Sequence, residues 1–282
     1  MKQKGIAVVG PTASGKTEMA INIALKIGGE IISADSRLVY KGFDIAAAKP
    51  TQEERKGIPH HLIDIVEPEV DYSAGDYLRD AKITINDIIS RGKTPIIAGG
   101  TGLYFRVLLE NYNLPEVKTD YELREYLNQK DRQELLNELS KIDPITYNRI
   151  KDSNTRRIVR ALEIIKTLKK PISELQMQKE PEYDVEWIMP NIKSREVLYE
   201  RINKRVDIMV QKGLVEETKI LLKKHGRIKN FVCTIGYQEI LTYLDGECSL
   251  QESIDKLKQH TRNYAKRQLT WFRKNPNLNV NI

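Results

Sequence analysis

The sequence predicts an α/β fold in which a parallel sheet is flanked by helices and carries an all-helical insertion domain. Short apolar strands alternate with amphipathic helices over the first 110 residues, which is the pattern of a parallel sheet covered by helices. A glycine-rich turn joins the first strand to the first helix. Between about residues 114 and 190, the chain shows mostly helical periodicity with polar connections.

The elements of the first part each have a local signal. The strands are short apolar runs, and the helix that precedes the third strand ends at Arg91-Gly92-Lys93. Ligands of such sheets bind beyond the carboxyl ends of the strands, so the segments that follow the strands should share one cleft. The expected strands are residues 6–9, 30–33 and 95–98, and the expected helices are a stretch from residue 16 and residues 77–90.

The second part is expected to be helical before the chain returns to the sheet. Leucines at helical spacing between residues 123 and 139 predict a helical pair. A third helix, residues 154–168, starts with basic residues that oppose the helix dipole, and an anionic ligand at that end would relieve the conflict. The last helix starts with a capping box, Ser249 and Glu252. The other expected elements are a strand at 185–189 and a helix at 195–212, and the expected domains are a core, residues 1–113 and 188–282, and a helical insertion, residues 114–187.

The net charge of +7 is unevenly distributed along the chain. Residues 1–110 contain 14 basic and 14 acidic side chains, so the whole excess lies in residues 111–282. Two segments concentrate it: residues 156–170 have six basic and one acidic side chain, and residues 250–282 have seven and two. Segregated positive charge favours a polyanionic partner, and a solvated helix face is the alternative.

The apolar runs and the cysteines of the chain indicate the cellular compartment in which we expect the protein. No apolar run approaches the roughly 20 residues that a membrane span needs, and Lys2 and Lys4 precede only a short strand rather than a signal peptide. The two cysteines, Cys233 and Cys248, form neither a metal-ligand pattern nor a disulfide framework. We therefore expect a cytoplasmic protein with reduced thiols and no membrane association, and we expect a monomer.

Residues 10–17 match the phosphate-binding pattern G-x-x-x-x-G-K-[ST] at every fixed position, between an apolar strand and a helix. Glycines let backbone N–H groups close on phosphate oxygens, and the helix N-terminus adds a favourable dipole. Lys16 can neutralise a phosphate, and Thr17 can ligate Mg²⁺. A glycine-rich turn without a ligand is the alternative. The core is thus expected to be P-loop NTPase-like, with a phosphate site formed by Gly10, Pro11, Thr12, Ala13, Ser14, Gly15, Lys16 and Thr17.

The loop alone does not select a reaction. A nucleoside triphosphatase or kinase usually places an acidic metal ligand after a neighbouring apolar strand, but the strand at 95–98 is followed by Gly99-Gly100-Thr101. An acid, Asp35, follows the second strand instead, and a carboxylate facing a phosphate cleft is a candidate general base. A turn or helix N-cap aspartate is the alternative. A small-molecule kinase and a nucleotide-switched RNA-binding protein remain competing functions.

Further segments, in order along nearly the whole chain, resemble the signatures of the tRNA dimethylallyltransferases, the IPP transferase family, in their bacterial form. Each of these segments is weak alone, whereas the ordered set is specific. The segments are Asp35-Ser36, Val39-Tyr40-Lys41-Gly42, Asp44-Ile45, Ala48-Lys49-Pro50, Pro59-His60-His61-Leu62-Ile63-Asp64, Gly99-Gly100-Thr101-Gly102-Leu103-Tyr104, residues 156–163 and residues 264–273.

The resemblance implies transfer of a dimethylallyl group from dimethylallyl diphosphate to N6 of the adenosine on the 3′ side of the tRNA anticodon, with release of diphosphate. It implies the tRNA anticodon stem-loop and dimethylallyl diphosphate as partners and Mg²⁺ as the cofactor. The phosphate loop would then hold a leaving group rather than ATP.

The resemblance also implies residue roles. Asp35 would accept the N6 proton from an extruded adenine. Lys16, with Mg²⁺ on Thr17, would stabilise charge on the diphosphate. Thr101 would hydrogen-bond the diphosphate, and Arg205 matches a diphosphate-contacting arginine, with a surface helix position as the alternative. The implied tRNA-contacting residues are Asp35, Ser36, Arg37, Leu38, Thr101, Arg124, Arg156, Arg157, Ile158, Val159 and Arg160.

The sequence departs from the family pattern at two places. Arg37-Leu38 stands where Met-Gln is common, so a base-edge contact is lost and Arg37 can contact phosphate instead. Ala46-Ala47 replaces the usual Gly-Thr, which removes a hydroxyl. The pair His60-His61 resembles a catalytic feature, but its position before apolar residues favours a structural role.

Overall fold

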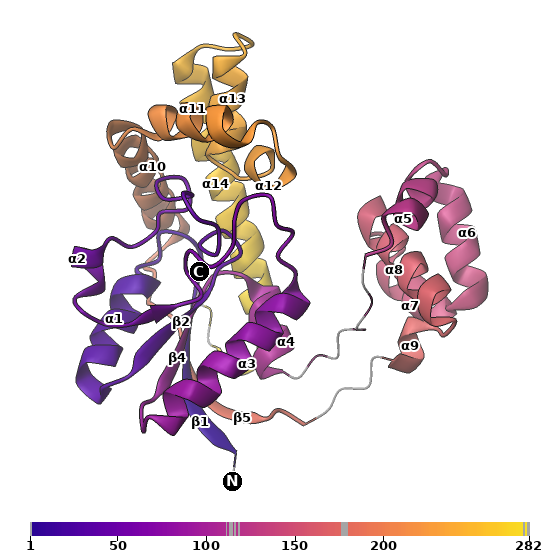
Figure 1. The fold of residues 1–282 in the computed structure, drawn as a ribbon, viewed down its shortest axis with the longest axis horizontal. Helices are drawn as coiled ribbons and strands as arrows, with labels where there is room; N and C mark the ends of the chain where they lie inside the picture. The colour runs from indigo at the N-terminus through magenta and orange to yellow at the C-terminus, as the bar shows by residue number, and fades with distance from the viewer. Residues whose placement is uncertain are drawn as a thin grey trace. The chain divides into compact units, whose positions relative to one another are not determined.

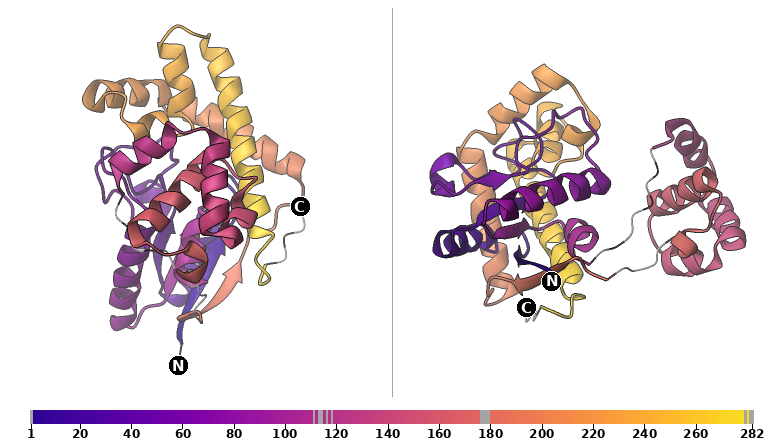
Figure 2. Two further views of the ribbon diagram at one scale, coloured as in Figure 1. Left: turned by 90° about the vertical axis from the view of Figure 1, so that its right-hand side faces the viewer. Right: turned by 60° about the horizontal axis from the view of Figure 1, so that its bottom comes forward.

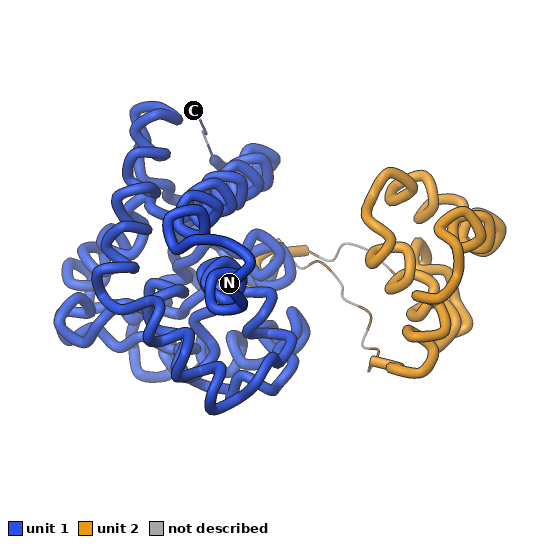
Figure 3. Tube along the Cα trace, turned by 90° about the horizontal axis from the view of Figure 1, so that it is seen from above, with its two compact units in different colours: residues 1–108, 182–282 blue, residues 109–181 orange. Residues whose placement is uncertain are grey.

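The computed structural model describes residues 2–110, 112, 115, 117, 119–175, 180–278 and 280. The chain divides into two compact units. Unit 1 contains Met1–Leu108 and Glu182–Ile282, and unit 2 contains Leu109–Pro181, as the two colours of Figure 3 show.

Unit 1 is built on a five-stranded parallel sheet in the order β3-β2-β4-β1-β5. Its strand register aligns three strand ends, because Gly99 is paired with both Val9 and Ala34. The expected parallel sheet is therefore confirmed, and the segments after these three ends share one edge of it. The strands are β1 (Gln3–Val9), β2 (Glu30–Ala34), β3 (His60–His61), β4 (Pro95–Gly99) and β5 (Tyr183–Ile188).

Helices cover the sheet and extend beyond the carboxyl ends of its strands (Figures 1 and 2). In Figure 1 the strands point toward the part of unit 1 that contains α10, α11 and α13. The helices of unit 1 are α1 (Lys16–Ile27), α2 (Gln52–Arg55), α3 (Ala74–Ser90), α4 (Gly102–Leu109), α10 (Arg195–Gln211), α11 (Leu214–His225), α12 (Lys229–Val232), α13 (Tyr237–Leu244) and α14 (Leu250–Phe272).

Capping residues set where the helices begin. Helix α14 starts after Ser249, whose hydroxyl accepts from the Glu252 N–H in the expected capping box. Helix α3 starts three residues earlier than residue 77, because Ser73 and Asp76 form a second capping box that hydrophobic periodicity does not reveal. Among the described residues, no helix is long and apolar enough to cross a membrane.

The described part of unit 2 is helical and has its own core. Leu127, Leu135 and Leu139 pack against Ile158 and Leu162, all fully buried. The third expected helix of this region corresponds to α8, which begins after the N-cap Asn154 and has basic but no acidic residues in its first turn. The helices of unit 2 are α5 (Tyr121–Asn128), α6 (Arg132–Ile142), α7 (Pro144–Ile150), α8 (Thr155–Leu168) and α9 (Ile172–Leu175).

The boundary expected between residues 187 and 188 falls inside β5. Tyr183 to Ile188 pair with β1 from Gln3 to Val8, so backbone hydrogen bonds assign this segment to the sheet. The sequence signal for the strand was correct, but the alternation of charged and aromatic residues in Tyr183-Asp184-Val185-Glu186 obscured where it starts. The second boundary likewise lies before residue 113, at Leu108.

A buried carboxylate ties the end of helix α3 to the sheet. Glu30 is 5% exposed and accepts hydrogen bonds from both terminal nitrogens of Arg91, while His61 Nε2 lies 2.8 Å from Glu30 Oε2. The hydrogen bonds from Arg91 lower the pKa of Glu30 to about 2, against the opposing effect of its burial. Ionised Glu30 therefore stabilises the fold at neutral pH.

We predict that Glu30→Gln destabilises the protein in a pH-dependent way. Because the pKa of Glu30 is lowered on folding, its contribution is present above about pH 4.5 and is lost as the pH falls toward 2. At pH 7 the free energy of unfolding of the variant should be about 2 kcal/mol lower than that of wild type, a value that allows for the partial exposure of Arg91. Thermal unfolding of the variant and of wild type from pH 7 to pH 3 checks this, with Glu247→Gln, at an exposed site, as the control. An unfolding difference that does not narrow at low pH contradicts it.

Candidate active site

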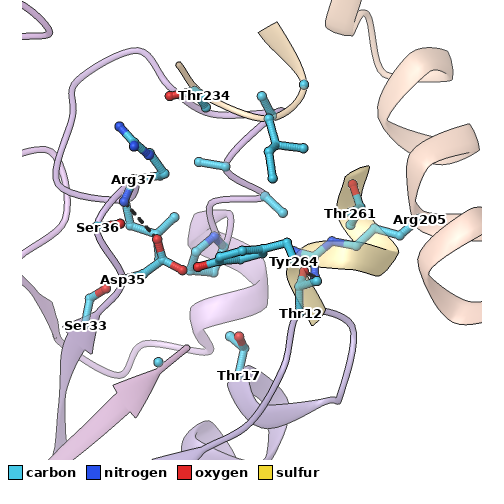
Figure 4. Close-up of a pocket in the computed structure, with 18 of the residues that line it drawn as sticks. Thr12, Thr17, Ser33, Asp35, Ser36, Arg37, Arg205, Thr234, Thr261 and Tyr264 are labelled. Carbon is cyan, nitrogen blue, oxygen red and sulfur yellow. Dashed lines mark hydrogen bonds between the residues drawn. The ribbon is translucent and has the colours of Figure 1, made fainter. Parts of the chain in front are cut away.

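The aligned strand ends open onto a cavity of about 430 Å³ (Figure 4). Its wall comes from the phosphate loop, the segment after β2, the end of β4 and the facing sides of α10 and α14. The expected shared cleft therefore exists. The polar and charged lining residues include Thr12, Lys16, Thr17, Ser33, Asp35, Ser36, Arg37, His60, Arg205, Thr261, Tyr264, Arg267 and Gln268.

A second cavity of about 690 Å³ lies against the phosphate loop. It is lined by Ala13 to Glu18 and by residues of the segment 44–56 and of helix α10. Lys16, Thr17 and Arg205 line both cavities, so the same cations are accessible from two directions.

Backbone geometry explains the small residues of the phosphate loop. Ala13 and Gly15 have φ of 62° and 90°, and the Ser14 N–H donates to Pro11 O at 3.3 Å. A Cβ on Gly10 would lie 2.8 Å from Ser14 Oγ, so a larger residue there would displace the Ser14 hydroxyl. Helix α1 then begins at Lys16, which places its unpaired N–H groups at the loop.

Lys16 and Arg205 form the cationic side of the cavity. Lys16 Nζ donates to Pro11 O at 3.2 Å, and Arg205 Nη1 donates to Thr12 Oγ1 at 3.3 Å. Burial and, to a lesser extent, the charge of Arg205 lower the pKa of Lys16 to about 8, against the opposing effect of the Asp35 charge. Burial also lowers the pKa of Arg205. Arg205 is thus part of the cavity rather than an ordinary surface residue of α10.

Asp35 faces the cavity and also stabilises its own turn. Its Oδ1 accepts from the Arg37 N–H at 2.8 Å, which is the dashed line in Figure 4. The turn function and the cavity function, which the sequence left as alternatives, are therefore compatible in one side chain. The second carboxylate oxygen has no hydrogen-bond partner among the described residues.

Thr101 lies behind the wall rather than on it. Its Oγ1 accepts from the Ser36 N–H at 3.1 Å and contacts the Tyr264 hydroxyl, and the described lining of the cavity includes Gly99 but not Thr101. Thr101 thereby holds the turn that presents Asp35 and Ser36. Its contact with a diphosphate or the bridging oxygen of that group stays a prediction.

Helix α14 supplies residues of the segment 264–273 to which the sequence assigned no role. Tyr264 projects into the cavity toward Asp35, and burial and the Asp35 charge raise its pKa, so the phenol is neutral (Figure 4). Arg267 lies over the Tyr264 ring at 5.7 Å, and Gln268 is 5% exposed. Gln268 falls three residues after the buried Ala265 on the apolar stripe of α14, and a polar residue in that stripe was the available signal.

The two histidines have different environments. His61 pairs with Glu30, which fits the expected structural role. His60 lines the cavity: its Nδ1 lies 2.8 Å from Ile58 O, so Nδ1 carries the proton, and burial lowers its pKa. His60 Nε2 and Ser33 Oγ are buried behind this wall and have no hydrogen-bond partner among the described residues.

An apolar patch lies beside these polar groups. Ala46, Ala47 and Ala48 line the cavity together with Met209 and Ile235. Glu217 of α11 holds the patch in place: its carboxylate accepts from the Ile45 N–H at 2.8 Å, from the Ala46 N–H at 3.2 Å and from the Tyr237 hydroxyl at 2.7 Å.

Lys49 has a structural rather than an anion-binding environment. Its Nζ donates to Tyr40 O at 3.2 Å, to Asp44 Oδ1 at 2.5 Å and to Asp64 Oδ1, which uses all three of its N–H groups. Its side chain is 6% exposed. The lysine therefore fixes the segment 40–50 and is not offered to a ligand, in contrast to Lys16 and Arg205.

Unit 2 separates its expected RNA-contacting residues into three groups. Ile158 and Val159 are buried in the core, so their side chains cannot reach a partner. Arg124 and Arg160 pair with the fully buried Glu163 at 2.8 and 2.9 Å and serve the stability of the unit. Arg156 and Arg157 are exposed at the N-terminus of α8.

A phosphate loop at the edge of a parallel sheet, two cations and a facing carboxylate define a P-loop enzyme that acts on a phosphate ester. Comparison with known proteins is more specific. The family model described as IPP transferase matches residues 38–275, and the chain belongs to this family.

Relatives match over nearly the full chain. The chain is 46% identical to the tRNA dimethylallyltransferase of Pelotomaculum thermopropionicum, covering 97% of this chain and 88% of the relative, and 45% identical to that of Bacillus pumilus, covering 96% and 87%. A crystal structure of the tRNA isopentenylpyrophosphate transferase from Bacillus halodurans matches with a TM-score of 0.72 and 42% identity, covering 98% of this chain and 88% of that one. A eukaryotic dimethylallyltransferase described as acting on tRNA matches with a TM-score of 0.84 and 32% identity, covering 96% and 70%.

We predict that the affinity of the loop for inorganic diphosphate depends on the protonation of Lys16. Because the pKa of Lys16 is about 8, the charged form that attracts an anion is lost as the pH rises from 7 to 9. Over this range the affinity of the wild-type protein for diphosphate should fall relative to that of Lys16→Met. The fall should reach up to about tenfold per pH unit above the pKa of Lys16. Titration calorimetry of both proteins checks this, since the ionisation of diphosphate itself affects both equally. Parallel pH profiles in the two proteins contradict it.

Proposed function

We propose that the protein transfers a dimethylallyl group from dimethylallyl diphosphate to N6 of the adenosine on the 3′ side of the anticodon in tRNA, with release of diphosphate. The observation that carries this proposal is the content of one cavity, in which Asp35 faces the cations Lys16 and Arg205 and an apolar patch lies on the same wall. The names of the relatives support the same reaction class and disfavour the kinase alternative.

The chemistry needs one bond to form and one to break. The N6 lone pair of adenine attacks the carbon that bears the diphosphate, and the carbon–oxygen bond breaks with its electron pair leaving on the diphosphate oxygen. N6 must then lose one proton. A carboxylate near the nucleophile and cations near the leaving oxygen satisfy both requirements.

Asp35 is the proton acceptor in this proposal. Its Oδ1 is held by the Arg37 N–H, which leaves the second oxygen to meet the N6–H group. The adenine has to leave its stack to reach this depth, as bases do in other base-modifying enzymes. Thr101 acts indirectly, through the Ser36 N–H and the Tyr264 hydroxyl.

Lys16 and Arg205 receive the leaving diphosphate, together with the unpaired N–H groups at the start of α1. In the free protein, the repulsion between the two cations adds to the effect of burial in lowering the pKa of Lys16. A multiply charged anion bound between the cations offsets this repulsion. The negative charge that grows on the leaving oxygen is therefore matched by positive charge placed there before reaction.

Mg²⁺ fits the residues that are present. The hydroxyl of Thr17 lies on the wall of both cavities and is a hard oxygen ligand of the kind that Mg²⁺ prefers. The described residues contain no group of three His, Cys, Asp or Glu side chains that could hold a metal alone, so diphosphate and water would complete the ligand set. Bound there by Thr17, Mg²⁺ would supply further charge to neutralise the diphosphate.

The dimethylallyl chain is accommodated by the apolar patch of Ala46, Ala47 and Ala48 with Met209 and Ile235. The alanines that replace the usual Gly-Thr leave this surface without a hydroxyl. Hydrogen bonds of Glu217 to the Ile45 N–H and to the Tyr237 hydroxyl fix the position of this patch in the cavity.

The tRNA is bound by exposed or cavity-lining cations for which the described residues offer no ion-pair partner. Arg37 at the cavity wall and the exposed Arg156 and Arg157 of unit 2 are suited to phosphate contacts. Both cysteines are free thiols, which suits the cytoplasmic compartment where tRNA is modified, and we propose that the protein acts there as a monomer.

Transfer of labelled dimethylallyl groups to total bacterial tRNA in the presence of Mg²⁺ tests the reaction directly. Asp35→Asn should keep the acceptor for the Arg37 N–H and lower kcat at least about 100-fold, because the proton acceptor is lost. Asp184→Asn, at an exposed position of β5, should leave the rate unchanged. Absence of transfer by wild type, or full activity of Asp35→Asn, refutes the assignment.

Charge reversal of Arg156 and Arg157 together should weaken tRNA binding and reduce the salt dependence of the affinity. Loss of two phosphate contacts lowers the slope of log K against log salt by about 1.5. Arg160 is left intact because it pairs with the buried Glu163. Binding measured from 50 to 300 mM salt, with Lys169 and Lys170 reversed at the other end of α8 as the matched control, checks this. Equal slopes in all three proteins would remove the start of α8 from the interface.

A further inference from the structure

Gln268 of helix α14 connects the phosphate loop to the end of strand β4. Its Oε1 accepts from the Thr12 N–H at 2.9 Å, and its Nε2 donates to Gly100 O at 3.0 Å. Because an N–H can only donate and a carbonyl can only accept, the two partners fix the orientation of the amide. Gln268 is 5% exposed, so both bonds are made where water does not readily replace them.

The glycines after β4 make room for this contact. A Cβ on Gly100 would lie 2.1 Å from Gln268 Nε2, and a Cβ on Gly102 would lie 2.2 Å from the Trp271 ring. The Gly99-Gly100-Thr101-Gly102 segment therefore serves as a close packing surface for α14. Two segments separated by more than 150 residues in the chain meet here at a distance that only glycine allows.

Thr12 is held from two sides by residues of the same cavity. Its N–H is bound by Gln268, and its Oγ1 accepts from Arg205. The Thr12 N–H is consequently not offered to a phosphate. The start of α1, from Lys16 onward, offers unpaired N–H groups instead, and the position of the loop that leads into it depends on how Thr12 is anchored.

We propose that Gln268 is a positioning residue for the diphosphate site: it anchors Thr12, so that helix α14 sets the geometry and the affinity of the phosphate loop. The inference rests on the proposed function in that the ligand of the loop is a diphosphate. It assigns Gln268 no contact with substrate. It makes the C-terminal helix part of the phosphate site, although the loop motif itself ends at Thr17.

The test compares Gln268→Met with wild type. Methionine keeps the volume of the side chain and removes both hydrogen bonds, so the fold should persist. The KM for dimethylallyl diphosphate and the inhibition constant of inorganic diphosphate should each rise roughly tenfold, since a buried N–H loses its partner. The tRNA dissociation constant should stay within about twofold. Gln259→Met is the matched control, because it makes the same change at an exposed position of the same helix.

Amide hydrogen exchange of Thr12 separates positioning from general stability. The Thr12 N–H should exchange faster in Gln268→Met than in wild type, whereas Gln268→Glu keeps the acceptor oxygen and should keep this N–H protected. Protection of Thr12 in both variants, or an equal loss of tRNA and diphosphate affinity, overturns the proposal. Diphosphate binding by calorimetry needs no turnover, so a wild-type protein that binds diphosphate but transfers nothing would refute the proposed function and leave this inference standing.

Discussion

The close approach of strands β2 and β4 at Gly99 is the constraint on which the site depends. A Cβ at this position would lie 2.1 Å from Ala34 O, so the two backbones can meet only because residue 99 is glycine. The same residue is in register with Val9 of β1. The phosphate loop that follows Val9 and the carboxylate that follows Ala34 are therefore brought to one level of the sheet, and one cavity can contain both.

Much of the fold was predictable because most of its longer elements carry a local signal. The apolar runs gave β1, β2 and β4, and the capping box at Ser249 gave the start of α14. The local signal fails where contacts between distant segments determine the limits of a strand or its position in the sheet. Charged residues alternate along β5, and its place in the sheet follows only from its pairing with β1. The two-residue strand β3 is defined by hydrogen bonds to β2, which no periodicity in two residues can indicate.

The site was predictable to the extent that it follows strand ends. Lys16 and Asp35 are found from the pattern of loop and strand, whereas Gln268 and Tyr264 enter from a helix more than 200 residues away. Positive charge was a weaker guide. Arg156 and Arg160 look alike in sequence, but a buried glutamate, Glu163, recruits Arg160 and leaves Arg156 to solvent. An ionised carboxylate in the core requires such cationic partners. The number of basic residues in a segment therefore exceeds the number of basic side chains that can contact RNA.

The geometry at Gly99 also bears on which phosphate chemistry the loop can serve. In kinases and nucleoside triphosphatases, an acidic side chain after a neighbouring strand holds the metal. Here β4 neighbours β1, and a side chain at its end would collide with Ala34 O. The carboxylate stands instead at the end of β2, where it faces the cations across the cavity rather than supporting a metal beside them. A cavity with cations on one side and a carboxylate on the other suits the proposed reaction, in which the diphosphate leaves and an amine takes up the transferred group.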